Sequence, residues 1–126
     1  MSNTNPTVTE IREWAYSNAP WPVEEWDLFL SWTGEVELFI ELAIDHSCAQ
    51  RLFFLHMLYY VIGATFTSPR RDEAVARVSW YAEKGRLIKH GDIKRWVSNV
   101  DSLVKGGLKY RYEDWRGGQL VGYEFT

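Results

Sequence analysis

The chain has 126 residues, of which 46 % are hydrophobic and 16 % aromatic, and a formal net charge of −3. This length fits a single domain over residues 1–126, and the many aromatic residues supply a core that needs neither a metal nor a cofactor. The single cysteine excludes an internal disulfide, the N-terminus does not resemble a signal peptide, and the longest apolar run, residues 52–63, is shorter than the ~20 residues that span a bilayer. We therefore expect a soluble cytoplasmic protein with no membrane contact.

Charge is divided unevenly along the chain. Residues 1–66 contain two basic and nine acidic residues, whereas residues 67–126 contain twelve basic and eight acidic residues. Such an asymmetry indicates either two halves that complement each other inside the fold or a surface for a partner.

Two short helices are predicted first, after residues 1–7, which are expected to be disordered. Thr7 begins the first helix because Thr7 and Glu10 have the spacing of a capping box, in which each side chain accepts a backbone N–H. The second helix begins near Pro22, where the missing N–H of proline costs nothing, and ends at Gly34.

A long central helix is predicted over about residues 36–62. At about 100° per residue, Glu37, Glu41 and Asp45 fall within about 80° of one another and form an acidic stripe. Beyond Leu52 nearly every direction is apolar, which is typical of a helix that is buried on all sides.

Two more helices follow, over residues 72–84 and 92–105. Gly85 is the predicted terminator of the first. Asp92 is the predicted cap of the second, and Gly106 its left-handed terminator. The second has apolar residues at i, i+3, i+4 and i+7 spacing: Ile93, Trp96, Val97, Val100, Leu103 and Val104.

The C-terminal tail changes to a period of two. Leu108, Tyr110 and Tyr112 alternate with charged residues, and a second alternating run covers residues 120–125 beyond Gly117 and Gly118. This pattern predicts a small β-hairpin, with a helix as the alternative. The predicted fold is therefore mainly α: a compact five-helix domain around the central helix, with a C-terminal hairpin.

No metal site or catalytic site is predicted. The acidic stripe lacks the Glu-x-x-His motif of helical di-metal sites, and His46 points away from it. Cys48 has no adjacent base, and the negative stripe would raise the pKa of its thiol, so we expect a small packing residue and not a nucleophile. Phosphate-binding and hydrolase motifs are absent.

These features leave three classes of function. An enzyme is less favoured than the first class, a small interaction protein of the inhibitor, adaptor or toxin-neutralising type. The predicted binding residues of this interaction protein are Glu37, Glu41, Asp45, Trp21 and Trp115, because acidic patches speed association with basic partners and tryptophans dominate binding hot spots. Trp26, Trp80 and Trp96 are assigned to the core.

The alternatives come from different classes. One is a metal-dependent hydrolase that uses the helix carboxylates together with Asp72 or Glu73. The other is a nucleic-acid-binding helical module that uses the basic segment 70–95. Nucleic acid is disfavoured because the bases of this segment alternate with acids and the chain is acidic overall.

Overall fold

The computed structural model describes residues 5–117 and residue 120, and this part of the chain folds into seven helices without a strand. The helices, in chain order, are α1 (Val8–Ala15), α2 (Trp26–Thr33), α3 (Val36–Ile44), α4 (Arg51–Phe66), α5 (Arg71–Gly85), α6 (Gly91–Val104) and α7 (Tyr112–Arg116). The prediction of a mainly helical chain is confirmed. The count of five was wrong, because the central helix is divided and a short helix replaces part of the expected hairpin.

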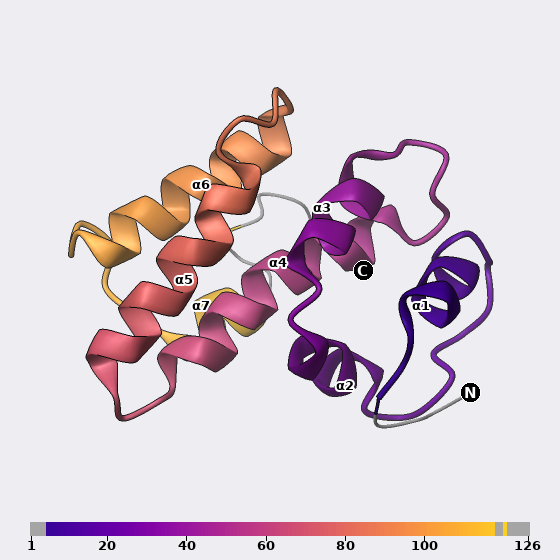
Figure 1. Cartoon of the computed structure of the whole chain (residues 1–126), viewed down its shortest axis with the longest axis horizontal. Coiled ribbons are helices and arrows are strands. Elements are labelled where there is room, and N and C mark those ends of the chain that lie inside the picture. The colour runs from indigo at the N-terminus through magenta and orange to yellow at the C-terminus, as the bar shows by residue number, and fades with distance from the viewer. Residues whose placement is uncertain (1–4, 118–119, 121–126) are drawn as a thin grey trace.

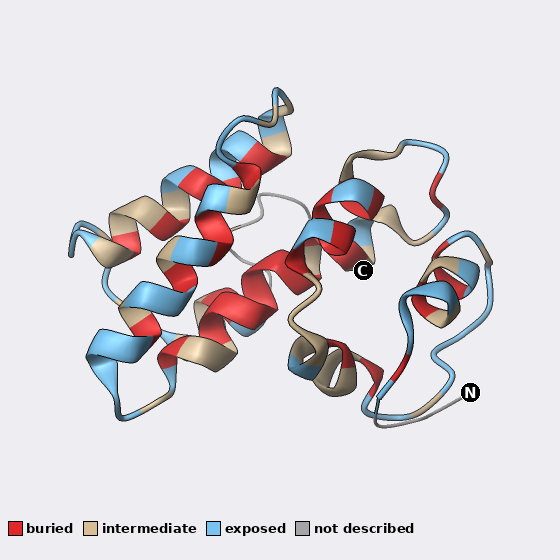
Figure 2. Cartoon of the chain, in the orientation of Figure 1, coloured by how far each residue is buried: buried red, intermediate tan, exposed pale blue. Residues whose placement is uncertain are grey.

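Helix α4 is the centre of the fold. It runs through the middle of the molecule, with the antiparallel pair α5 and α6 on one side and α1 and α2 on the other (Figure 1). Most of its surface is buried (Figure 2), as expected for a helix that is apolar in nearly every direction. Unlike the sequence prediction, the helix continues past Gly63 to Phe66.

The predicted central helix is interrupted at Asp45, whose side chain makes local hydrogen bonds. Asp45 has extended backbone angles, and its carboxylate accepts the N–H of Ser47 at 2.9 Å and the Ser47 hydroxyl at 2.7 Å. Such Asx turns compete with helical hydrogen bonds. The N–H of Gln50 then donates to the carbonyl of Ala15 at 3.0 Å, which holds the α3–α4 loop against the end of α1.

Several helix ends have the capping residues that the sequence predicted. Thr7 and Glu10 form the predicted capping box, with both hydrogen bonds at 3.1 Å. Gly34 and Gly106 have positive φ, as expected for left-handed terminators. Helix α6 begins at Gly91, and its cap is His90, two positions before the predicted cap Asp92.

The first strand of the predicted hairpin is absent. Residues 108–111 alternate in burial, which agrees with the period of two, but they form no strand in the described part of the chain. Helix α7 follows directly, because its Trp115 is fully buried against α4. The predicted second strand falls on residues that, apart from residue 120, lie outside the described ones.

The core is rich in aromatic rings. Trp26 and Trp96 are fully buried, as predicted, and the indole N–H of Trp96 donates to the carbonyl of Leu58 at 2.9 Å. The five apolar residues of α6 from Ile93 to Leu103 are likewise buried. Among the described residues, no helix combines the length and the apolar character that crossing a bilayer requires.

Candidate functional site

Two of the three predicted acidic residues lie together on α3. Glu37 has a side chain that is 72 % exposed, and its carboxylate lies 3.0 Å from the ammonium of Lys84 on α5. Glu41 is half-exposed and accepts two hydrogen bonds from the guanidinium of Arg12 on α1, one of them at 3.0 Å. The Arg12 hydrogen bond also lowers the pKa of the Glu41 carboxyl. Both carboxylates thus reach the surface while paired with cations of other helices.

Asp45 leaves the predicted stripe because the helix ends there. Its carboxylate accepts the hydroxyl of Tyr16 at 2.6 Å. This bond, followed by those from Ser47, lowers the pKa of Asp45, and it is the main reason why the pKa of Tyr16 rises to about 12. The predicted stripe is therefore a pair of carboxylates on α3 and a separate aspartate in the following loop.

The two predicted tryptophans do not join the acidic pair in one surface. Trp21 is partly exposed and packs edge-on against Phe53, with ring centroids 5.7 Å apart. Trp115 is fully buried beside Tyr59. The prediction that Trp115 belongs to a binding surface was wrong, because the short helix α7 directs its side chain towards α4.

A groove between α3 and α5 is the main hollow beside the acidic pair. Its volume is about 490 Å³. We call it the α3–α5 groove, and its lining residues are Glu37, Ile40, Glu41, Ile44, Lys84 and Ile88. Three isoleucines give the groove an apolar lining, and two glutamates and one lysine give it charged groups. This site was not predicted, because Lys84 and Ile88 join the α3 residues only in the folded chain.

The groove continues towards Trp80. An adjoining hollow of about 250 Å³ shares Glu37 and Lys84 with it and is also lined by Trp80. Trp80 is 51 % exposed, and the Lys84 ammonium lies 4.2 Å from its ring centroid in a cation–π contact. The assignment of Trp80 to the core was wrong: α5 buries Ala74, Val78, Tyr81 and Ala82, and Trp80 is outside that face.

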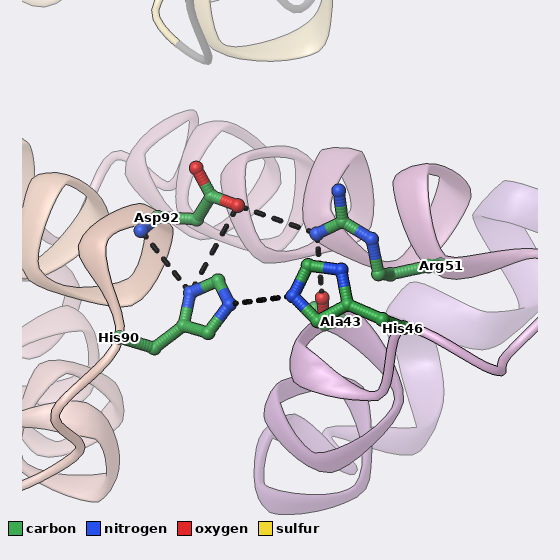
Figure 3. A network of polar contacts seen from close by, with 5 residues as sticks. All are labelled: Ala43, His46, Arg51, His90 and Asp92. Carbon is green, nitrogen blue, oxygen red and sulfur yellow. Dashed lines mark hydrogen bonds and ion pairs between the residues drawn. The ribbon is translucent and has the colours of Figure 1, made fainter.

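Two histidines that follow lining residues of the groove in the chain contact each other. Ile44 and Ile88 line the groove, and two residues after each of them come His46, in the α3–α4 loop, and His90, before α6. The Nε2 atoms of the two histidines are 3.4 Å apart (Figure 3). The same order, Ile-x-His, occurs in both segments, but nothing in either segment alone indicates that they meet.

Polar groups hold the second histidine in place. The N–H of Asp92 donates to His90 Nδ1 at 3.3 Å, and the Asp92 carboxylate lies 3.9 Å from the same nitrogen. Arg51 joins this network from α4, with one guanidinium nitrogen 3.0 Å from the Ala43 carbonyl and 3.3 Å from the Asp92 carboxylate (Figure 3). The Arg51–Asp92 and Lys84–Glu37 pairs both connect the acidic half of the chain to the basic half.

The cysteine is a packing residue, as predicted, although it lies in a loop. Cys48 is buried, and its thiol donates to the Ala15 carbonyl at 3.3 Å. Burial is the largest cause of its raised pKa. A thiol held in this way is a poor nucleophile at neutral pH.

No family model, no curated protein and no solved structure matches this chain. The function must therefore be inferred from the geometry of the molecule.

The geometry gives little support to a metal-dependent hydrolase or to a nucleic-acid-binding module. Within the described residues no three His, Cys, Asp or Glu side chains converge as a metal centre would require. In the basic segment, Arg70 pairs with Glu73, and Arg86 pairs with Glu83 and with Asp101. Three of the eight basic residues of that segment, Arg70, Lys84 and Arg86, are thus paired with carboxylates.

Proposed function

We propose that the chain is a small cytoplasmic interaction domain, of the inhibitor, adaptor or toxin-neutralising type, that binds a protein partner in the α3–α5 groove. The observation that carries this proposal is a groove that combines an apolar lining with two exposed carboxylates. Ile40, Ile44 and Ile88 can take apolar side chains of a partner, and Glu37 and Glu41 can take its basic ones. The exposed ring of Trp80 extends this surface with the residue type most enriched in binding hot spots.

A partner could replace an internal cation beside a carboxylate of the groove. The Lys84–Glu37 pair is exposed on the glutamate side, and such surface pairs contribute little to folding stability. A cation of the partner can therefore replace Lys84 beside Glu37 at small cost, while Lys84 keeps its contact with Trp80.

Placing a charge on the apolar lining of the groove should weaken partner binding. We expect Ile88→Glu to weaken the complex by about 2 kcal/mol or more, roughly thirtyfold in Kd, because a carboxylate would be desolvated where apolar groups now meet. The measurement is paired affinity capture from lysate with wild type and Ile88→Glu, followed by titration of the captured partner. Thermal melting of each variant verifies that it is folded.

Leu87→Glu is the matched control. Leu87 is the neighbouring residue, is 91 % exposed and does not line the groove, so the same charge there should leave binding unchanged. A partner that Leu87→Glu loses as readily as Ile88→Glu does, or that both variants keep, would contradict binding in the groove.

The carboxylates should set the rate of association. We expect the double variant Glu37→Gln, Glu41→Gln to bind the same partner several-fold more slowly at low salt and to differ less from wild type at high salt, because exposed charges steer encounter and are screened by ions. Stopped-flow or surface binding kinetics at two ionic strengths measure this. An unchanged association rate in a folded double variant would mean that Glu37 and Glu41 serve only Lys84 and Arg12.

A further inference from the structure

We propose that the exposed face of α5 pairs with the same face of a second copy of this chain, with the two helices antiparallel around a two-fold axis. This face carries four side chains that we call the α5 band: Glu73, Arg77, Trp80 and Lys84. Of the residues that line the α3–α5 groove, only Lys84 belongs to the band. The proposal concerns the purified chain alone and does not depend on the docking role of the groove.

The α5 band is narrow and lies on the surface. At about 100° per residue, its four members fall within about 60° of one another. Helix α5 buries a different face against α4 and α6 (Figure 1). Glu73, Arg77 and Trp80 are exposed, and Lys84 is partly buried. A hollow of about 530 Å³ runs along the three exposed members and Ala76, so another molecule can reach the band.

The spacing of the band makes it complementary to itself. Its intervals of four, three and four residues are the same in both chain directions, and such intervals are typical of the seam between two packed helices. When two copies of α5 lie antiparallel about the middle of the band, Glu73 of each copy lies opposite Lys84 of the other. Arg77 of each copy then lies opposite Trp80 of the other. The two-fold axis gives each of these contacts twice.

Arg77 and Trp80 both gain from this contact. Arg77 pairs with no acid among the described residues, unlike Arg70 and Arg86. Trp80 is half-exposed, although the burial of a tryptophan is favourable. A guanidinium stacks well on a tryptophan ring, and the attraction grows when water is excluded. Tryptophan and arginine are also the residue types most enriched in binding hot spots.

The present contacts of the two charged end members allow the pairing. Glu73 lies 3.1 Å from Arg70, but both side chains are exposed, and such pairs contribute little to stability. Lys84 lies 3.0 Å from Glu37, and its ammonium has three N–H donors, so it can bind a second carboxylate as well. Glu73 can therefore meet Lys84 of the second copy without the loss of a buried interaction.

The dimer should be weak and reversible. The α5 band spans only about 16 Å along the helix, and small contacts are typical of transient complexes. We therefore expect a Kd on the order of 10–100 µM.

Sedimentation equilibrium of the purified full chain, from roughly 5 to 500 µM, tests the proposal. Wild type should pass from monomer to dimer and no further. Glu73→Lys and Lys84→Glu should each weaken the dimer at least about tenfold, because each change places like charges opposite each other twice. An equimolar mixture of the two variants should associate with nearly the wild-type affinity, because both pairs of the mixed dimer again join opposite charges.

Asp72→Lys is the matched control. Asp72 is also exposed in the first turn of α5 but lies outside the band, so the same change of charge there should leave the dimer as in wild type. A wild type that stays monomeric, a mixture of the two reversed variants that stays monomeric, or an Asp72→Lys variant that loses the dimer as readily as Glu73→Lys does would overturn the proposal.

A further variant decides if Lys84→Glu does not fold, which circular dichroism verifies. Arg77→Glu breaks no ion pair of the described residues, so it should fold as wild type does. It should weaken the dimer at least about tenfold, because it removes the cation from the ring of Trp80 twice. A folded Arg77→Glu variant that dimerises like wild type would contradict the proposed contact.

Discussion

Trp115→Ala is expected to lower the free energy of unfolding by about 3–5 kcal/mol, the usual cost of emptying a buried aromatic site. Trp115 is fully buried although it belongs to a helix of five residues, and its ring stacks at a tilt beside Tyr59. A helix of this length is not stable by itself, so the loss of its one buried side chain should also release α7 from α4. Urea unfolding measures the first effect, and hydrogen exchange of the α7 amides measures the second.

Two other variants are controls. Trp115→Phe keeps an aromatic ring but removes the indole N–H, and Trp32→Ala removes a tryptophan outside the core. The Trp115 indole N–H is buried without an acceptor among the described residues, so Trp115→Phe should cost much less than Trp115→Ala. Trp32→Ala should cost little, because Trp32 is exposed on α2. A Trp115→Ala variant that unfolds at the same urea concentration as Trp32→Ala would show that α7 does not stabilise the fold.

Gly63→Ala is expected to destabilise the protein by about 1–2 kcal/mol, although alanine favours helices over glycine by about 1 kcal/mol. A Cβ atom on Gly63 would lie 2.8 Å from the Cβ of Trp115, an atom fixed directly to the α7 backbone. The Tyr110 hydroxyl also donates to the Gly63 carbonyl at 2.9 Å, so this end of α4 and the C-terminal segment meet closely. To accept the methyl group, α7 must move away. Urea unfolding of the variant measures the net effect.

Gly91→Ala is the matched control for this change. Gly91 is also helical, with φ negative, and a Cβ atom there would meet nothing within 4 Å. Alanine at this position should be neutral or stabilising by up to about 1 kcal/mol. Equal stabilisation in both glycine variants would refute the close approach of α7 to Gly63.

The sequence alone was sufficient for the features that depend on residues a few positions apart. The capping box of Thr7, the terminators Gly34 and Gly106, and the buried face of α6 all arise within one or two turns of chain, where spacing determines which groups can meet. The buried character of α4 was equally predictable, because apolar residues in nearly every direction are typical of a helix that is buried on all sides.

The tertiary structure decided everything that depends on distant partners. Periodicity ran through Asp45 without interruption, but the bonds to Ser47 and Tyr16 and the contact of Gln50 with α1 end the helix there. The alternating pattern in the tail reflects alternating burial without a strand, and Trp115 enters the core on a helix that packs closely against Gly63 of α4. The α3–α5 groove and the His46–His90 contact join segments more than 40 residues apart. Their geometry depends on how helices pack, and local spacing contains no information about it.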